Sequence, residues 1–519
     1  MRLINTETLQ LEFYAGGSRR YAILSHVWGN DEVTFQDITS ADANEALHLD
    51  HYKKLRESCK MARSLKLDYL WVDTCCIDKS SSAELSEAIN SMFRWYAESV
   101  VCIAFLEDVP PLESDEEKKK AFYDSRWFTR GWTLQELIAP GKVIFYGQDW
   151  QRLGTRAELK EDIKLVTGIN VELLAGTHHM TEMIQRQLGE LSVAEKMCWA
   201  AGRITTRPED IAYCLLGIFD INMPLLYGEG KIKTFKRLQE EIIKSTDDES
   251  IYAWRQPRYR VEGKTYWSLL ASCPSAFNID HAAKDTNGLV LIPKKSKYLS
   301  LRSATSTSMT NRGLELELSL TPFPVDKSGT IFLAFLNCEF RRGQTSINPA
   351  ILLQRAAWDT DSYFVRVRPD IIALSMMNSI ILPDELMNMI RGGQSEVLQE
   401  AIPRQIFVPH TTPDLRYLKG VIFRPAIKGL KEGSKLTLRV RSRSPTWQYF
   451  VDARRGLSNT PESYEINFDL APGPSLGSLK EPMVLGVLEL QAVSRGGIGA
   501  IASQPVPDDA SLLFTVVCF

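Results

Sequence analysis

The amino-terminal part of the chain alternates short apolar runs with longer stretches whose apolar residues recur at helical spacing. The apolar runs lie at residues 20–29, 69–73, 100–106 and 142–146. Runs of this length with little polar alternation are typical of strands buried on both faces of a parallel sheet. The stretches between them carry an apolar residue every three or four positions, as amphipathic helices do. This pattern predicts an α/β domain in which helices flank a parallel sheet.

The pattern changes twice further along the chain. Residues 151–250 read as helical throughout, and Ser192 with Glu195 forms a capping-box signature at one helix start. Past Trp254, short alternating or apolar segments are separated by turn residues, which is typical of antiparallel sheets in a sandwich or barrel. We therefore expect an α/β domain at 1–150, a helical extension at 151–250 and a β-rich domain at 251–519.

Two stretches inside the first domain have sequence patterns that predict their local structure. Residues 110–120 are acidic and then basic, and we expect a solvated connection there. Residues 125–140 end in Pro-Gly, so they predict a helix that stops just before the strand at 142–146. In such a helix Trp132 and Glu136 share one face, and a carboxylate beside an indole is partly desolvated.

Polar residues follow the first two predicted strands. They are Ser25, His26 and Trp28 after the first strand, and Asp73 and Asp78 at the end of the second. Because ligands bind outside the carboxyl ends of parallel strands, we expect these side chains to converge with Glu136.

Other interpretations of the same residues remain open. Trp127, Phe128 and Trp132 are equally suited to a core, with Glu136 paired to Arg126 or Arg130. Asp73 suits a helix cap or a pair with Lys79, and His26 suits a core position. A cysteine protease would need His26 or His51 to orient Cys75 or Cys76.

Composition narrows the class of protein. The 519 residues hold 61 Lys and Arg against 64 Asp and Glu, which argues against a nucleic-acid footprint over the whole surface. Nine Cys and seven His are scattered, so we expect reduced thiols, no metal site and no disulfide framework. The start lacks a signal-peptide pattern, and no apolar run reaches membrane-spanning length. We expect a cytoplasmic protein without a membrane span.

Three segments carry a family resemblance. They are Tyr21-Ala-Ile-Leu-Ser-His-Val-Trp-Gly29, Tyr69-Leu-Trp-Val-Asp-Thr-Cys-Cys-Ile-Asp-Lys79 and Arg130-Gly-Trp-Thr-Leu-Gln-Glu-Leu-Ile-Ala-Pro140. In this order they resemble the heterokaryon incompatibility (HET) domain of filamentous fungi. The stretch from Ala194 to Lys231, running on to Ala253-Trp254, resembles the segment that often comes after it. The resemblance implies an effector of fungal non-self recognition whose activation triggers growth arrest or programmed cell death.

The stretch at 125–140 also resembles, more weakly, the helix of TIR domains that carries the catalytic glutamate of NAD cleavage. Thr133 stands where that pattern has Cys, and residues 74–79 replace its glycine-bearing loop. The resemblance implies a TIR-like α/β fold, NAD glycohydrolase activity with Glu136 as the carboxylate, and a homo-oligomer on activation.

In that case NAD is a substrate and no cofactor is needed. Glu136 would stabilise the ribosyl cation, with Asp73 as a second acid. Trp28 and Trp132 would stack on nicotinamide or adenine, and Arg126 and Arg130 would hold the pyrophosphate. Ser25, His26 and Asp78 complete the expected binding set.

The alternative is a non-enzymatic signalling module that acts by self-association. Its tryptophans would then be core residues, and the β-rich region would bind an unknown protein partner or ligand. The exposure of Glu136 separates the two: a pocket with Trp28 and Asp73 favours the enzyme, and a carboxylate paired under a packed lid favours the module.

Overall fold

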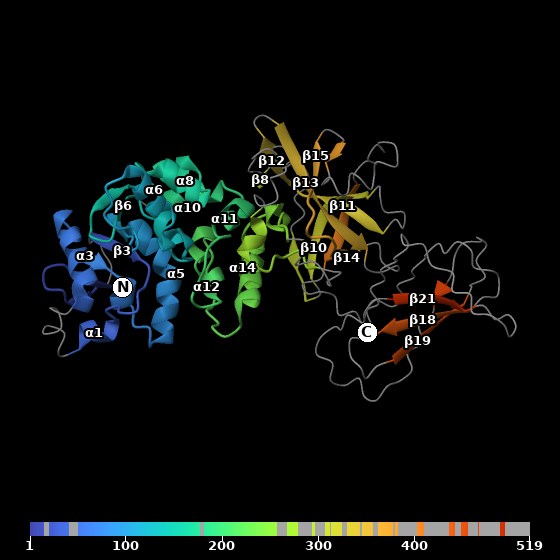
Figure 1. Ribbon diagram of the computed structural model, residues 1–519, viewed down its shortest axis with the longest axis horizontal. Helices are drawn as coiled ribbons and strands as arrows, with labels where there is room; N and C mark the ends of the chain where they lie inside the picture. Colours follow the sequence, from blue (N-terminus) through green and yellow to red (C-terminus); the bar gives the residue numbers. More distant parts are fainter. Residues whose placement is uncertain are drawn as a thin grey trace.

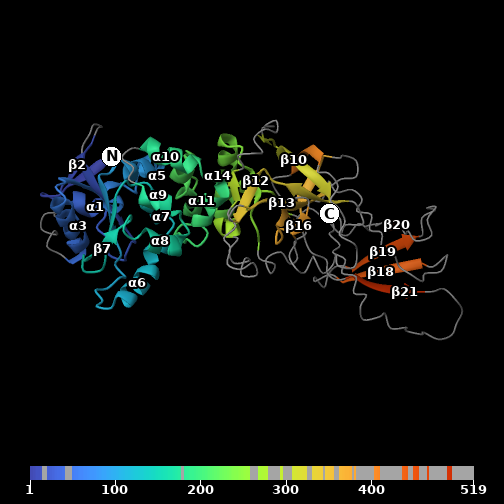
Figure 2. The same cartoon turned by 90° about the horizontal axis from the view of Figure 1, so that it is seen from above.

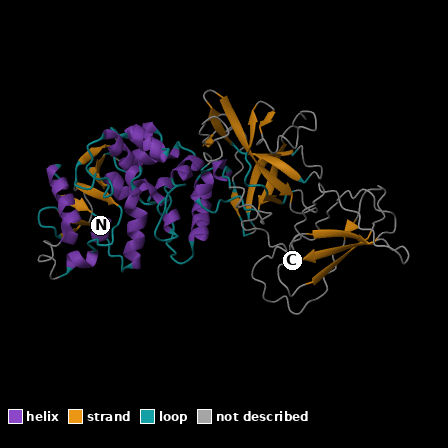
Figure 3. Ribbon diagram, viewed as in Figure 1, coloured by secondary structure: helices purple, strands orange, loops and turns teal. Residues whose placement is uncertain are grey.

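The structure is a computed structural model, and part of the chain is described by it. The described residues are 1–14, 20–40, 50–176, 181–256, 267–278, 293–295, 307–311, 313–323, 330–342, 345–355, 362–376, 379–381, 402–408, 435–441, 448–454, 465–466 and 488–493. Figures 1 and 2 show an α/β part at one end, a helical segment beside it, and then a β-sheet. Figure 3 shows the same division by secondary structure, with strands dominating after the helical segment.

A seven-stranded sheet forms the amino-terminal part, in the order β2-β1-β4-β3-β5-β6-β7. Its four parallel strands are β3 (Tyr21–His26), β4 (Tyr69–Trp71), β5 (Val101–Phe105) and β6 (Val143–Tyr146). Every residue of β3, β5 and β6 is buried, which explains why these strands read as apolar runs. The predicted α/β class with a parallel sheet is confirmed.

Three short antiparallel strands extend the sheet, and the sequence pattern did not predict them. They are β1 (Arg2–Asn5), β2 (Leu11–Phe13) and β7 (Arg152–Thr155). Both β2 and β7 are edge strands and only partly buried, so their sequences need no apolar run. β7 lies beyond the boundary we expected at residue 150.

Helices connect the strands and flank the sheet (Figure 1). They are α1 (Phe35–Thr39), η1 (Asp50–Tyr52), α3 (Lys53–Ser64), α4 (Asp73–Cys76), α5 (Ser82–Glu98), α6 (Asp115–Tyr123), η2 (Arg126–Thr129) and α7 (Thr133–Ile138). On α3 the buried Leu55, Cys59 and Ala62 form the apolar face that the spacing predicted.

The expectation of an unstructured connection at 110–120 is wrong, because helix α6 begins there. Asp115, Glu116 and Glu117 occupy its first turn, where acidic side chains favour the positive end of the helix dipole. Lys120 lies in the last turn, where the opposite charge is favoured. The acidic-then-basic order is thus a helix signal as well as a sign of solvation.

The stretch at 125–140 is two helical pieces, η2 and α7, rather than the single helix we expected. Arg130 is extended between them, with φ −79° and ψ 141°. The Gly131 amide donates to Ile204 O at 3.0 Å, and the Ile204 amide donates to Thr129 O at 2.6 Å. A Cβ on Gly131 would lie 2.5 Å from Thr205, so only glycine permits this approach. A distant segment therefore breaks the helix.

The segment after the sheet is built from short helices. They are α8 (Lys160–Thr167), α9 (Val171–Ala175), α10 (Thr181–Gly189), α11 (Val193–Trp199), α12 (Asp210–Tyr213), α13 (Leu216–Phe219), α14 (Lys231–Ser245), η3 (Glu249–Tyr252) and η5 (Pro274–Phe277). The Ser192 hydroxyl accepts from the Glu195 amide, as the capping signature predicted. Gly217 lies against Phe93 of α5, where a Cβ would come within 2.1 Å of Phe93 Cβ. The helical segment therefore packs closely on the α/β part.

The remaining described strands form two antiparallel sheets. The ten-stranded sheet contains β8 (Pro293–Lys295), β9 (Ser308–Met309), β10 (Leu314–Pro322), β11 (Ile331–Phe335), β12 (Cys338–Arg342), β13 (Thr345–Arg355), β14 (Phe364–Arg366), β15 (Ala373–Met376), β16 (Ser379–Ile381) and β17 (Ile402–Val408). The four-stranded sheet contains β18 (Lys435–Arg441), β19 (Gln448–Arg454), β20 (Glu465–Ile466) and β21 (Leu488–Val493). The predicted β-rich character of this region is confirmed.

A buried arginine joins the ten-stranded sheet to the helical segment. Arg366 of β14 donates to Tyr252 O at 2.9 Å and to Trp254 O at 2.6 Å. Its guanidinium lies 3.9 Å from the centre of the Trp254 ring. Both carbonyls lose their donor if this side chain is removed, and a cavity remains beside Trp254.

We predict that Arg366→Ala lowers the free energy of unfolding by about 3 kcal/mol, because two buried carbonyls lose their donor and a cavity forms. Chemical denaturation followed by circular dichroism measures this. The matched control is Arg186→Ala, which removes an exposed arginine of α10 and should change stability by less than about 0.5 kcal/mol. Equal effects of the two variants would contradict the assigned junction.

Candidate functional site

Ser25 and Glu136 meet at the carboxyl edge of the parallel strands. Ser25 lies near the end of β3, and Glu136 lies on α7. The Ser25 hydroxyl donates to Glu136 Oε2 and accepts a hydrogen bond of 2.8 Å from Trp127 Nε1. All three side chains are buried, and Glu136 is only 7% exposed. This contact brings together three segments that are far apart in sequence.

The carboxyl group of Glu136 is neutral in this environment near pH 7. Burial raises its pKa to about 8, and the nearby carboxylate of Asp73 raises it as well. Hydrogen bonds with Ser25 and Tyr96 and the charge of Arg203 act in the opposite direction. Desolvation is the largest effect, because a fully buried carboxylate loses its hydration without a salt bridge to replace it.

Asp73 and Trp28 are in contact with each other, and the charge of Asp73 acts on Glu136. Asp73 begins α4 directly after β4, and its Oδ2 accepts from Trp28 Nε1 at 2.9 Å. Trp28 is 49% exposed, and Lys79 Nζ lies 3.7 Å from its ring centre. Asp73 therefore neither pairs directly with Lys79 nor occupies the cap position, which Val72 holds. The indole is the exposed aromatic surface at this edge.

His26 takes part in a separate ion-pair cluster centred on Glu32. His26 Nε2 lies 3.2 Å from Glu32 Oε2, and Lys54 Nζ lies 2.6 Å from Glu32 Oε1. Burial alone would raise the pKa of Glu32, but hydrogen bonds from His26, Gly29 and Lys54 outweigh it and lower the pKa to about 2. Glu32 was not predicted from the sequence, although its place three residues after Gly29 puts it in the loop that leaves β3.

The other predicted residues have partners elsewhere. Asp78 is bound by Ser80 and Gln36, and Arg126 pairs with Asp108 at 3.4 Å. Arg130 donates to Thr206 at 2.9 Å, and Trp132 Nε1 donates to Asp210 at 3.2 Å. The structure thus brings Ser25 into contact with Glu136 and Trp28 into contact with Asp73, while Arg130 and Trp132 contact the helical segment. Trp132 and Glu136 take different partners although they are one helical turn apart.

Arg203 is the cation that acts on Glu136, and no sequence pattern pointed to it. Its Nη1 donates to Arg130 O at 2.7 Å and to Thr133 Oγ1 at 2.9 Å. Its Nη2 is buried and has no hydrogen-bond partner among the described residues. Neither Arg126 nor Arg130 pairs with Glu136, so the basic group near the carboxyl comes from outside the α/β part.

Comparison with known proteins identifies a family for the amino-terminal part of the chain. Residues 21–110 match the family described as "Heterokaryon incompatibility protein (HET)". The chain carries a HET domain. A similar protein, "Vegetative incompatibility protein HET-E-1" of Podospora anserina, is 47% identical over 228 residues. The alignment covers 43% of this chain and 16% of that relative, and no solved structure matches significantly.

The match to the HET family confirms the resemblance inferred from the sequence motifs. Ser25, His26, Trp28 and Asp73 lie inside the matched residues, and Glu136 comes after them. The HET domain therefore supplies both strand ends of the site, while α7 brings the carboxyl group to them.

The adjacent thiols of the HET domain are unsuited to nucleophilic attack. Cys75 and Cys76 are buried, and burial raises the pKa of Cys75 to about 12 and that of Cys76 well above its usual value. A thiolate is the reactive form, so both thiols are inert in this state. Among the described residues, no group of three or more His, Cys, Asp or Glu is placed to hold a metal ion. None of the described helices has the length and apolar character needed to cross a membrane.

We predict that Glu136→Gln stabilises the protein increasingly as pH rises. The folded pKa of about 8 exceeds the ordinary value of 4.5, so the folded state holds a proton that the unfolded state has released between these values. Wild type therefore loses stability across this window, by on the order of a few kcal/mol in total, whereas a neutral glutamine does not.

Chemical denaturation of both proteins at about pH 5 and about pH 8.5 measures the difference, which should grow with pH. Glu161→Gln, at an exposed position of α8, is the control and should show a constant difference. A pH-independent difference for Glu136→Gln would show that the carboxyl has an ordinary pKa.

Proposed function

We propose that this protein is an effector of vegetative incompatibility, the response triggered by contact with non-self, and that its HET domain cleaves NAD. The HET domain and the name of the 47%-identical relative support the first part. The cleavage proposal depends on one observation: a buried carboxyl group lies at the carboxyl edge of the sheet, near Asp73. Perturbed carboxyl groups at this edge are typical of catalytic sites.

The proposed reaction is hydrolysis of the bond between nicotinamide and ribose. The bond breaks with its electron pair going to the nicotinamide nitrogen, and water adds to the ribose carbon while its proton leaves to solvent. The products are nicotinamide and ADP-ribose. A carboxylate next to the oxocarbenium-like ribose stabilises the transition state, as in glycoside hydrolysis.

The raised pKa of Glu136 fits a substrate that brings its own positive charge. The nicotinamide ring of NAD is cationic, and a cation beside a carboxyl group lowers its pKa. The neutral carboxyl of the resting protein would therefore ionise when the substrate binds. Asp73 is the second acid of the proposed site, and the exposed indole of Trp28 offers a surface for a ring of the substrate.

The remaining predicted residues need a change of partner before they act. Arg126, Arg130 and Trp132 now contact Asp108, Thr206 and Asp210. Glu136 itself is shielded, since α7 is tied to the helical segment through Arg203. We propose that activation loosens this contact, that self-association of the protein accompanies it, and that a partner or ligand acts through the β-rich region. A cytoplasmic location completes the proposal.

The second candidate is a HET domain that signals by self-association without catalysis. The observation in its favour is that Glu136, Ser25 and Trp127 form a closed hydrogen-bonded set inside the core. Such a set can specify the fold without touching a substrate.

The deciding experiment measures NAD loss and nicotinamide release by the purified full chain, at high protein concentration and with a crowding agent. We expect wild type to consume NAD and Glu136→Gln to lose activity by about a thousandfold, because a transition-state contact is removed. Glu136→Ala should be equally inactive, and Glu161→Gln should retain wild-type activity.

The same variants distinguish the second candidate. If wild type does not consume NAD, yet its expression kills cells and Glu136→Gln kills equally well, self-association is the function to pursue. Circular dichroism establishes that the inactive variants are folded.

A further inference from the structure

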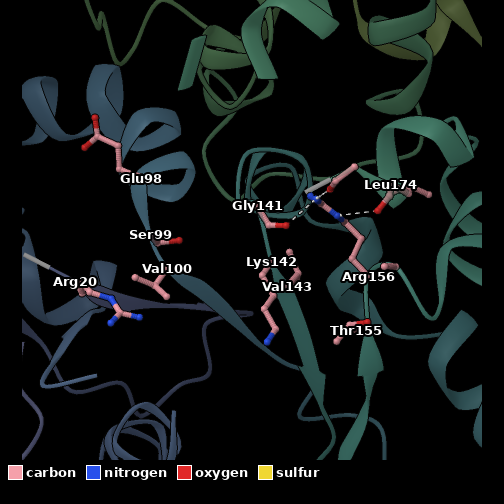
Figure 4. A pocket seen from close by; sticks show the side chains of 12 residues that line it. Arg20, Glu98, Ser99, Val100, Gly141, Lys142, Val143, Thr155, Arg156 and Leu174 are labelled. Atoms are coloured by element: carbon pink, nitrogen blue, oxygen red, sulfur yellow. Dashed lines mark hydrogen bonds between the residues drawn. The ribbon is translucent and has the colours of Figure 1, made fainter. Parts of the chain in front are cut away.

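A cavity of about 540 Å³ lies at the opposite edge of the same sheet from Glu136. Its lining includes Arg20, Val100 and Lys142, which directly precede or begin the amino ends of β3, β5 and β6. Arg156, just after β7, completes it. Figure 4 shows Arg20 and Glu98 on one side of the cavity and Arg156 on the other, with Lys142 between them.

The charge of this lining is mainly positive. Arg20, Lys142 and Arg156 face the cavity together with a single carboxylate, Glu98. Arg20 and Lys142 are exposed, and no described carboxylate lies within ion-pair distance of either. Three cations beside one carboxylate leave an excess of positive charge that attracts anions, and a cavity strengthens the effect.

The environment of Arg156 is the strongest indication that a bound anion supplies the missing negative charge. Arg156 is 3% exposed, and its guanidinium donates only to main-chain carbonyls. These are Leu137 O at 2.7 Å, Gly176 O at 2.8 Å, Leu174 O and Ile138 O at 3.1 Å, and Gly141 O at 3.4 Å. Carbonyls satisfy the N–H groups but leave the positive charge uncompensated.

We propose that this cavity binds a small organic phosphate. Its volume is within the range of small-molecule sites. Arginine recognises phosphate oxygens by paired hydrogen bonds and lysine as a point charge, so Arg20 and Lys142 are the direct contacts. The N–H groups of Arg156 are already bound to carbonyls, so Arg156 contributes its charge alone. The side chains that line it beside the cations include Val100, Val143 and Leu174 and no aromatic ring, so recognition depends on the phosphate rather than on stacking with a base.

The cavity is linked to Glu136 through one helix. Arg156 Nη1 binds the carbonyls of Leu137 and Ile138, at the carboxyl end of α7. A cation at this end stabilises a helix. An anion that attracts Arg156 therefore acts directly on the helix that carries the carboxyl group. The binding itself does not depend on the proposed NAD cleavage.

Isothermal titration calorimetry of the full chain with ribose 5-phosphate and with inorganic pyrophosphate tests the proposal. We expect saturable binding of one ligand per chain. Arg20→Gln and Lys142→Gln should each weaken it about tenfold, and the double variant about a hundredfold, because each removes one charge-assisted contact. Both residues are exposed, so these variants should fold.

The control is Lys119→Gln, which removes an exposed charge of α6 away from the cavity and should leave binding unchanged. Glu136→Gln should also bind normally, which separates this result from the NAD experiment. The proposal is overturned if no saturable binding is found. It is also overturned if the double variant binds like wild type, or if Lys119→Gln weakens binding as much as Lys142→Gln.

Discussion

The structure depends on a carboxyl group that is buried without an ion pair to any described residue. Glu136 is held by the hydroxyl of Ser25, which Trp127 in turn holds, so a strand end, η2 and α7 are fixed relative to one another. The pKa of about 8 means that this group is neutral near pH 7 and that the protein loses stability when the group ionises. A core that needed only packing would be served better by an apolar side chain of similar volume. This loss of stability therefore argues that Glu136 has a role beyond folding.

Three buried arginines hold neighbouring parts of the chain together, and each binds main-chain carbonyls. Arg156 holds the end of α7, Arg203 holds its beginning against the helical segment, and Arg366 holds the ten-stranded sheet against that same segment. Planar guanidinium groups suit this work because one side chain can satisfy several carbonyls at once. Buried arginines therefore hold both ends of the helix bearing Glu136 and, separately, the contact between the β-rich region and the helical segment.

The sequence predicts those features of the fold and site that depend on neighbouring residues, and it does not predict those that depend on a distant segment. The buried parallel strands and the amphipathic face of α3 depend on local apolar spacing, so the sequence pattern identified them. The break at Arg130 depends on Ile204, and the cation near Glu136 is Arg203, both from a distant segment. Spacing within one helix cannot report such partners. The contact between Ser25 and Glu136 could be expected from the sequence, because Ser25 lies near the end of a parallel strand, where site residues are expected.

The closed state of Glu136 is compatible with an effector that is silent until it is triggered. Polar contacts tie α7 to the helical segment: Arg203 with Arg130 and Thr133, and Trp132 with Asp210. Polar contacts of this kind exchange with water more readily than apolar packing of the same area. Arg203 Nη2 is without a hydrogen-bond partner among the described residues, so this junction has one hydrogen bond left to gain. The opening that we propose for activation would act at this junction of α7 with the helical segment.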